Sequence, residues 1–494
     1  MASRKRKIPN DKSARLEAEV QAPTDGTLQP ATAGNGPESA LHPDKPGSVR
    51  PHYESPGSIA SPYKTDQFYR NLYFKEPNFR ELARKDAGFA RFIKQNGQLD
   101  FTDPAAVMQL TKSLLMANFG LKIELPDDRL CPPVPNRHNY ILWLKNLLDT
   151  SSYQQPGGKL CGLDVGTGAS CIYPLLGTAQ RPWCFIATDI DARSLSYARQ
   201  NVSLNGLDNR IRVVQRSTTD HLIPLDDLGI PSIDFVMMNP PFYISENEML
   251  SSANKKSRPP HSACTGAPVE MVCDGGEVAY VGRMVQESLV MRDRVKWYTS
   301  MLGKVTSLEA LVEQLRANNI DNYAVTEFVQ GNKTKRWALG WSFGPMRPDD
   351  DAARGIKAAI WKKVLPPVVR MDLLALPAFS EVGRVIKRIT DVVGSLELSS
   401  WTWETQALKG VGRARENVWC RAWRRKKMRD MAVEEAQSAA IDASEEDCRL
   451  GFAILVDVGM AGTTVTLRWV EGHEQSLFES LGGFLQGKLK DLAG

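Results

Sequence analysis

The chain has 494 residues, which is enough for two or three domains and at least one large hydrophobic core. Its 42% hydrophobic and 24% charged residues are typical of a globular protein, and the formal charge of +5 is modest, so any affinity for nucleic acid must come from local basic clusters. Eight scattered cysteines and six histidines, with no Cys-x-x-Cys pair, predict neither a metal site nor a disulfide framework. We find no apolar run of membrane-spanning length and no signal-peptide core, so we expect no membrane partner and no secretion.

Residues 1–60 are rich in Pro, Gly, Ser, Ala and charge and contain almost no aromatic residues. Such a segment buries too little apolar surface to offset its ordering entropy, so we predict a disordered basic tail. Its start, Ser3-Arg-Lys-Arg-Lys7, indicates a nuclear-import signal or a nonspecific nucleic-acid patch; a solvated basic end is the alternative. We therefore expect nuclear localisation and leave a cytoplasmic pool open.

We predict that residues 61–150 form a helical extension that binds RNA. Asp103-Pro104 favours a helix start, and apolar residues at helical spacing continue to Gly120. The interleaved Arg and Lys residues fit an RNA groove and solvated helix charges equally well. Beyond a proline-rich linker, Tyr140–Leu148 predicts a short helix. Arg137, just before it, is either a clamp for a carboxylate or an ordinary surface residue.

Residues 151–345 read as regular strand–helix units. The predicted strands are compact apolar runs, and Gly206 closes the helix predicted over Ala192–Asn205. The strands are Leu160–Leu163, Trp183–Ala187, Ile211–Gln215 and Ile233–Met238. Their spacing is typical of βαβ units, and it predicts a doubly wound α/β sheet.

Polar or glycine-rich residues follow each of these four strands. The turn Asp164–Ser170 contains Gly166 and Gly168, but Cys171 breaks the dinucleotide fingerprint Gly-x-Gly-x-x-Gly. Asp189 is placed to hold ribose hydroxyls, and Ser217–Asp220 can contact an adenine ring. With Asn239-Pro-Pro-Phe242 at the fourth strand end, the set predicts a class I (Rossmann-like) S-adenosylmethionine site.

Asn239-Pro-Pro-Phe242 suits methylation of a planar nitrogen. Pro240 and Pro241 end the strand, so Asn239 projects at its carboxyl end. The Asn239 side-chain carbonyl and the Pro240 backbone carbonyl can accept the amine hydrogens, which favours a pyramidal nitrogen without a strong base. Stacking on Phe242 contributes about 1–3 kcal/mol, comparable with the cost of extruding a base, so an unpaired adenine is favoured. Alone, the motif also fits a plain turn, a guanine amine or a glutamine side chain.

The segment from Ser245 to Phe343 completes this unit. Ser245–His261 predicts a loop that gates substrate or grips phosphate, or an inert insertion. Helices are predicted over Val269–Val290, with a boundary at Gly275-Gly276, and over Ser307–Ala317. Asn322–Gln330 and Lys335–Phe343 predict a hairpin across Gly331-Asn332. Its candidate RNA contacts are Lys333, Lys335 and Arg336.

The C-terminal third predicts a linker or partial domain over 346–412 and a basic arm with an RNA-binding module over 413–494. Arg413–Arg429 combines many cations with Trp419 and Trp423, which suits phosphate neutralisation plus base stacking; nuclear import or a solvated helix is the alternative. Beyond it, Leu450–Val458 and Thr463–Val470 are β-rich and Leu477–Leu489 is helical, which predicts a small α+β module.

With these residues in view, the chain resembles the methyltransferase-like 16 family over roughly Phe68 to Phe343. The resemblance is carried by the following stretches: Asp100–Val107, Val134–Tyr140, Asp164–Leu176, Asn239–Phe242, Trp297–Lys304, Thr326–Gly331 and Arg336–Leu339. The run Gly-Thr-Gly-Ala-Ser-Cys-Ile-Tyr-Pro-Leu-Leu within the third stretch is specific to the family.

The resemblance implies an RNA N6-adenosine methyltransferase with S-adenosyl-L-methionine as cofactor. It implies association with U6 small nuclear RNA or structured hairpins, whereas bacterial relatives act on large-subunit ribosomal RNA. An RNA-binding regulator with slow methyl transfer is a further alternative. The implied cofactor contacts are Arg137, Gly166, Ser170, Asp189, Asp220 and Asn239, and the implied substrate contacts are Asn239, Pro240, Pro241 and Phe242. Asp189 stands where relatives often carry glutamate, and Asp220 where threonine is expected.

Overall fold

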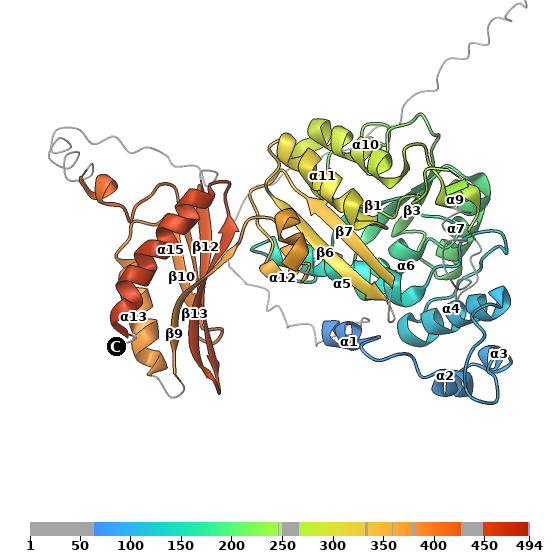
Figure 1. The fold of residues 1–494 in the computed structure, drawn as a ribbon, viewed down its shortest axis with the longest axis horizontal. Coiled ribbons are helices and arrows are strands. Elements are labelled where there is room, and N and C mark those ends of the chain that lie inside the picture. Colours follow the sequence, from blue (N-terminus) through green and yellow to red (C-terminus); the bar gives the residue numbers. More distant parts are fainter. Residues whose placement is uncertain are drawn as a thin grey trace, which may run out of the picture. The chain divides into compact units, whose positions relative to one another are not determined.

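The computed structural model describes residues 64–245, 247–248, 266–330, 334–357, 359–377, 381–425 and 448–492. The predicted basic tail, most of the loop after Ser245, Lys333 and the end of the basic arm lie outside the described residues. Within the described ranges, the strands form an eight-stranded sheet and a five-stranded sheet (Figure 1).

The larger sheet has the order β3-β2-β1-β4-β5-β7-β6-β8. Its strands are β1 (Cys161–Val165), β2 (Cys184–Asp189), β3 (Ile211–Gln215), β4 (Ile233–Met238), β5 (Val295–Leu302), β6 (Tyr323–Gln330), β7 (Thr334–Trp341) and β8 (Arg354–Gly355). Strands β1 to β5 pair in parallel, and β7 runs antiparallel to β5 and β6. The strand order reverses between β1 and β4, where open α/β sheets bind ligands. The predicted class I methyltransferase fold is confirmed.

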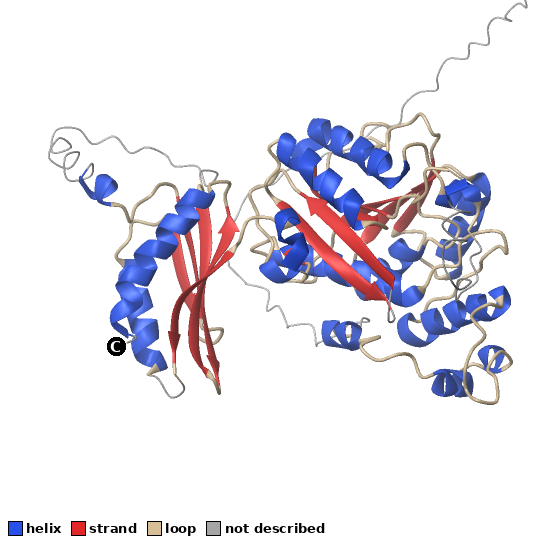
Figure 2. Cartoon of the chain, in the orientation of Figure 1, coloured by secondary structure: helices blue, strands red, loops and turns tan. Residues whose placement is uncertain are grey.

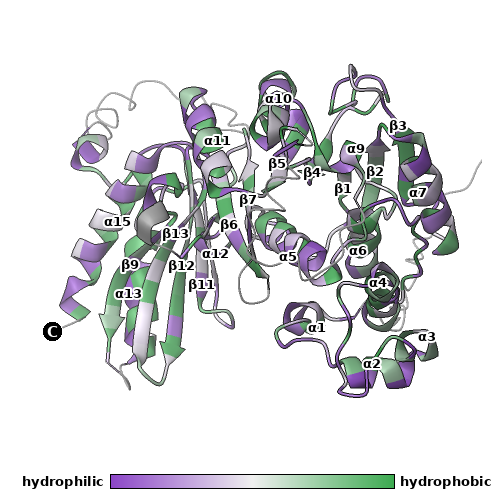
Figure 3. Ribbon diagram, turned by 45° about the vertical axis from the view of Figure 1, so that its right-hand side comes forward, coloured by the Kyte–Doolittle hydropathy of each residue, from purple (hydrophilic) through white to green (hydrophobic). Residues whose placement is uncertain are grey.

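Helices cover both faces of this sheet (Figure 2). One face carries α5 (Val134–Thr150), α6 (Ile172–Gln180) and α7 (Ala192–Leu204), and the other carries α10 (Gly276–Met291) and α11 (Val305–Ala317). Strand β4 shows the cause, because its side chains alternate: Phe235 and Met237 join the first hydrophobic cluster, and Val236 and Met238 join the second. Helix α7 correspondingly has both hydrophobic and hydrophilic residues (Figure 3).

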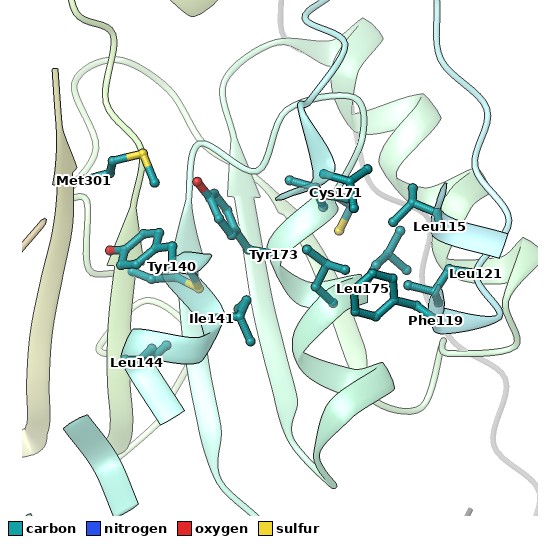
Figure 4. Close-up of a cluster of buried hydrophobic side chains, with 14 of the residues drawn as sticks. Leu115, Phe119, Leu121, Tyr140, Ile141, Leu144, Cys171, Tyr173, Leu175 and Met301 are labelled. Atoms are coloured by element: carbon teal, nitrogen blue, oxygen red, sulfur yellow. The ribbon is translucent and has the colours of Figure 1, made fainter. Parts of the chain in front are cut away.

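The N-terminal extension adds four helices, whose buried side chains join the hydrophobic cluster of the first face. They are α1 (Asp66–Asn71), α2 (Phe79–Lys85), α3 (Ala87–Ala90) and α4 (Pro104–Phe119). The helix predicted from Asp103 to Gly120 is confirmed, because Asp103 accepts a hydrogen bond from Ala105 N and Gly120 ends the helix at φ 70°. Leu115 and Phe119 of α4 meet Leu175 of α6 in the cluster of Figure 4.

One helix boundary differs from the sequence prediction, and another is confirmed. Helix α5 begins at Val134 instead of Tyr140, because Pro135 lies in the first turn, where its missing N–H costs no hydrogen bond. In the segment predicted to be helical over Val269–Val290, the predicted boundary at Gly275-Gly276 is confirmed: it separates the short helix α9 (Pro268–Met271) from α10, and Gly275 and Gly276 adopt φ values of 72° and 66°. Strands β3 and β4 have the predicted bounds, and β6 and β7 form the predicted hairpin.

The smaller sheet is antiparallel, with the order β10-β11-β12-β13-β9. Its strands are β9 (Arg370–Leu376), β10 (Ser400–Glu404), β11 (Lys409–Ala414), β12 (Leu450–Gly459) and β13 (Gly462–Glu471). Helices α13 (Val382–Gly394) and α15 (Gln475–Leu489) lie side by side on one face (Figure 1). The boundary expected between 412 and 413 falls inside β11. The C-terminal module therefore begins earlier than expected, near Arg370.

Two residues of the expected basic arm are structural. Arg413 lies in β11 and its Nε is 3.0 Å from Oε2 of Glu471. Trp419 is 3% exposed in the core of the C-terminal module and donates a hydrogen bond to Ser480 Oγ. The expectation that Trp419 stacks on RNA is therefore corrected, because its ring is already covered by protein.

Candidate active site

A cavity of about 480 Å³ opens at the carboxyl ends of β1 to β4. The residues predicted for cofactor binding all line it: Arg137, Gly166, Ser170, Asp189, Asp220 and Asn239. They come from five segments of the chain, and the sheet topology brings their strand ends to one edge. Pro241 also lines the cavity, whereas Pro240 and Phe242 are not part of its wall.

The turn after β1 exposes backbone to the cavity. Gly166 and Gly168 have φ values of 73° and 64°, a conformation that strongly favours glycine. Gly166 N and Thr167 N each donate to Thr188 O at 2.9 Å, which fixes the turn against the end of β2. The absence of two side chains allows a ligand to approach the main chain closely.

Asp189 is held at the edge of the cavity by backbone donors. Its Oδ2 accepts from Gly168 N at 2.8 Å and its Oδ1 from Asp191 N at 2.9 Å. Burial raises the pKa of Asp189, and the backbone hydrogen bonds oppose that rise. The carboxylate position is therefore linked directly to the glycine turn.

Arg137 lies in the first turn of α5 and is 7% exposed. Its Nη1 donates to the Tyr173 hydroxyl at 2.9 Å, whereas its buried Nε has no hydrogen-bond partner among the described residues. Tyr173 lies beside Tyr140 and Met301 in Figure 4. A buried guanidinium with an unused donor is placed to receive an acceptor from the cavity.

Asp220 differs from the expectation of a free adenine contact, because its carboxylate closes its own turn. It accepts from Ser217 N at 2.9 Å and from Ser217 Oγ at 2.7 Å, and these bonds lower its pKa. Arg283 of α10 donates to the Asp220 backbone carbonyl and so fixes the same loop. The loop lines the cavity, but its acid is already engaged.

Asn239 follows β4 directly, as predicted, and its Oδ1 is buried with no hydrogen-bond partner among the described residues. The aromatic ring of Phe242 lies 5.2 Å from the Arg336 guanidinium carbon. It also packs against Gly303, where a Cβ atom would be 2.9 Å from Phe242 Cδ1. The motif therefore combines an unused amide oxygen with an aromatic ring that contacts two other segments.

Hydroxyl groups support the end of β4. The Tyr140 hydroxyl is 2.9 Å from Thr299 Oγ1, which donates to Val236 O at 2.9 Å. The Tyr140 hydroxyl also lies 3.5 Å from both N and O of Met238, the residue before Asn239. A buried tyrosine thus occupies the place where the ladder between β4 and β5 has ended.

Sequence reasoning assigned no role to Asp164, the acid near the carboxyl end of β1. Its carboxylate is fully buried, and neither oxygen has a hydrogen bond of ordinary geometry among the described residues. Burial raises the pKa of Asp164 to about 7, although nearby Arg137 favours the charged form. The signal was available in the sequence, as an acid at the carboxyl end of a buried strand.

Sequence reasoning also missed the segment 267–273, which forms part of the cavity wall. Tyr243 N donates to Met271 O, and Cys273 N donates to Tyr243 O, both at 3.0 Å. The residue after Phe242 is therefore paired with a segment almost 30 positions away in the chain. No local pattern could have revealed this contact.

A sequence profile of an RNA methyltransferase family matches residues 63–345, more than half of the chain. A U6 small nuclear RNA (adenine-(43)-N(6))-methyltransferase of Schizosaccharomyces pombe is 34% identical over 397 residues, which covers 80% of this chain and 96% of that protein.

The chain belongs to the methyltransferase-like 16 family of RNA methyltransferases.

Further members agree over the catalytic domain. The human RNA N(6)-adenosine-methyltransferase METTL16 is 42% identical over 258 residues, covering 51% of this chain and 45% of that protein. The catalytic domain of human METTL16 in complex with a MAT2A 3′UTR hairpin (hairpin 1) is similar with a TM-score of 0.51 and 41% identity, over 56% of this chain and 94% of that one. This chain thus spans nearly the whole fission-yeast protein and about half of the human one.

The cavity of this methyltransferase-like 16 member fits S-adenosylmethionine, the cofactor of the family. Unused polar atoms at or just beneath its wall are Arg137 Nε, both Asp164 oxygens, Thr167 Oγ1 and Asn239 Oδ1. They match a ligand that carries a carboxylate, an ammonium group and hydroxyls. In the described part of the chain, no group of three or more His, Cys, Asp and Glu side chains is placed to hold a metal ion, and no helix is long and apolar enough to cross a membrane.

Proposed function

We propose that the chain transfers a methyl group from S-adenosylmethionine to N6 of an unpaired adenosine in structured RNA, with U6 small nuclear RNA as its substrate. The observation that carries this proposal is the unpartnered Asn239 Oδ1, rigidly placed after β4 at the edge of the cofactor cavity. The name of the fission-yeast relative supports both the RNA and the atom. The RNA hairpins bound to the human catalytic domain support a folded substrate.

Asn239 and Pro240 would activate the amine. S-adenosylmethionine supplies an electrophilic methyl group when bound. The Asn239 amide oxygen and the Pro240 carbonyl accept one amine hydrogen each, which turns the nitrogen lone pair toward that methyl group. The proton leaves after transfer, so the step requires no strong base.

Phe242 would hold the target base by stacking on it. Pro241 would stiffen the turn that joins Asn239 to Phe242. The ring is supported by Arg336 on the hairpin strand β7 and by the close approach of Gly303. A base already unpaired in the RNA needs little additional energy to reach it. The site therefore favours a bulged or looped adenosine.

On the cofactor side, Arg137 would bind the methionine carboxylate through its unused Nε. Asp189 would accept hydroxyls of the ribose, with Gly166 and Ser170 leaving the turn open to the ligand. The loop ending at Asp220 would line the adenine, through its backbone rather than its engaged carboxylate. The buried carboxylate of Asp164, which interacts electrostatically with Arg137, would face the cofactor ammonium group.

The regions outside the catalytic domain would bind RNA. The helical extension and the C-terminal module would hold the structured part of the substrate, and Arg336 at the hairpin would contact its backbone. Nuclear localisation follows from the proposed substrate. The basic segment from Ser3 to Lys7 is the candidate import signal.

The test uses purified full chain, labelled S-adenosylmethionine and a U6 transcript, followed by nucleoside analysis. We expect N6-methyladenosine, and a loss of about 10²–10³-fold in rate with Asn239→Ala. Asn209→Ala, an exposed asparagine far from β4, is the matched control and should retain the wild-type rate. Methylated guanosine, or product only on ribosomal RNA, would contradict the proposal. Tight RNA binding without any product would favour the regulator alternative.

A further inference from the structure

Glu270 of the short helix α9 places a carboxylate in the wall of the cofactor cavity. Its Oε2 accepts hydrogen bonds from Leu130 N at 2.8 Å and from Ala267 N at 2.9 Å. Its Oε1 lies on the side of the glycine turn, since a Cβ atom on Gly168 would be 3.8 Å from it. The side chain therefore connects the segment before α5, the segment 267–273 and the turn after β1.

Some charges in the cavity wall are compensated by a side chain of opposite charge. Asp191 pairs with Arg129 at 3.0 Å, and Asp220 lies 3.5 Å from Arg216. Two arginines of the wall are also paired with carboxylates, Arg216 with Asp227 and Arg283 with Glu287. Glu270 forms no salt bridge within the described residues, although Arg129 favours its charged form; Asp189 and the exposed Asp274 also form none.

The methyl donor and its product differ in charge at one atom. Both carry an amino-acid group, but the donor has a positively charged sulfonium and the product a neutral thioether. A carboxylate without a salt bridge, in a partly enclosed cavity, stabilises the charged ligand more than the neutral one. Burial raises the pKa of Glu270, and its two backbone hydrogen bonds favour the ionised form.

We propose that Glu270 is a specificity-determining residue whose carboxylate makes the cavity prefer the charged methyl donor over the neutral product. This inference rests on the methyl-transfer function proposed above. The preference would limit product inhibition, because S-adenosylhomocysteine would be replaced by fresh S-adenosylmethionine after each transfer. Asp189 faces the same cavity, but its position at the end of β2 assigns it to the ribose.

The same hydrogen bonds suggest a simpler role, in which Glu270 only closes the first turn of α9. Glu270→Gln separates the two roles, because the amide oxygen can still accept from Leu130 N and Ala267 N while the charge is lost. Glu277→Gln is the matched control. Glu277 is a buried glutamate that accepts from Gly303 N at 2.6 Å and Lys304 N at 3.0 Å, and it is not part of the cavity wall.

The experiment measures dissociation constants by calorimetry on the full chain, without RNA. The ligands are S-adenosylmethionine, S-adenosylhomocysteine and sinefungin, an analogue in which a protonated amine replaces the methylated sulfonium. In Glu270→Gln we expect the preference for S-adenosylmethionine over S-adenosylhomocysteine to fall about tenfold, with sinefungin following the methyl donor. Glu277→Gln should retain the wild-type ratio.

Equal weakening of all three ligands in Glu270→Gln would overturn the inference and leave the capping role alone. Unchanged affinities would overturn it as well. The proposed function itself is judged on the wild-type chain. If that chain bound neither S-adenosylmethionine nor its product, the methyl-transfer proposal would fail first.

Discussion

Asp164 is an acid buried without a hydrogen bond of ordinary geometry, and this makes its protonation sensitive to folding. Its pKa is raised from 3.8 to about 7 by burial, so the native state holds the proton more tightly than the unfolded chain does. The stability contributed by this group is therefore full below about pH 4 and is lost as the pH rises toward 7.

We predict that Asp164→Asn removes this part of the pH dependence in the cofactor-free protein. Between about pH 4 and pH 8, the free energy of unfolding of the wild type should fall by up to about 2–4 kcal/mol more than that of the variant. Denaturant titrations at both pH values measure the difference. If the free energy of unfolding changed equally with pH in the two proteins, Asp164 would not be a buried carboxyl group without a hydrogen-bond partner.

Gly303 is a second residue whose role comes from geometry, since it leaves room for the Phe242 ring. In Gly303→Ala the new Cβ atom would push the ring aside. We expect kcat/KM for RNA to fall about tenfold or more, with S-adenosylmethionine affinity unchanged. Gly158→Ala, which meets no atom within 4 Å, is the control and should match the wild type in both measurements.

The end of strand β4 is supported by a side chain from another element, because the Tyr140 hydroxyl of helix α5 contacts Met238 and Thr299 there. Tyr140→Phe would remove the hydrogen bond between the Tyr140 hydroxyl and Thr299 Oγ1 and the contacts of that hydroxyl with Met238. The last peptide group of β4 would then be less constrained. We predict a loss of about 1–3 kcal/mol in unfolding free energy and a decrease in kcat that exceeds any change in KM.

Tyr298→Phe provides the comparison for this prediction. Tyr298 lies on the adjacent strand β5, and its hydroxyl donates to Arg292 O at 2.7 Å, away from the motif. Its loss should lower stability to a similar extent without a matching decrease in kcat. A similar decrease in kcat for both variants would mean that general stability, and not the position of Asn239, sets the rate.

The elements predicted correctly are those whose ends are determined by residues at the ends themselves. Strand β4 ends at Met238, two residues before Pro240, and helix α4 ends at Phe119, just before Gly120; in both cases the ending residue acts on its own backbone. The start of α5 was missed because the proline-rich run before Arg137 is typical of a linker. Only the structure shows that Pro135 lies in the first turn of the helix. The wall segment 267–273 was missed because its pairing with Tyr243 is a tertiary contact.

The C-terminal module has a hydrophobic core of its own. Phe452, Trp469 and Phe478 belong to a cluster separate from the two clusters of the catalytic sheet. The sequence prediction placed a domain boundary within β11. It assigned β9 and α13 to a linker, because each is recognisable as part of the module only from its contacts with β13 and α15. Pairing of β9 with β13 across some 90 positions cannot be recognised from local pattern.

We predict that a chain ending at Leu365 keeps its affinity for S-adenosylmethionine and loses at least about tenfold in affinity for U6 RNA. The reason is that the cofactor cavity lies within the first sheet, whereas part of the proposed RNA surface is removed. The dependence of RNA affinity on salt should also become shallower, because fewer phosphates are neutralised. Calorimetry and RNA titrations at two salt concentrations measure these effects, and unchanged RNA affinity would assign the module another role.

The pairing of Tyr243 with the segment that carries Glu270 has a thermodynamic consequence. Tyr243, next to the turn proposed to bind adenosine, pairs with the segment that forms one wall of the cofactor cavity, so binding at one of these sites would affect the other. Such coupling is reciprocal: whatever factor RNA adds to the affinity for the methyl donor, the donor must add to the affinity for RNA. Intracellular supply of S-adenosylmethionine would thus set how firmly the enzyme holds its RNA, as well as how often it methylates it.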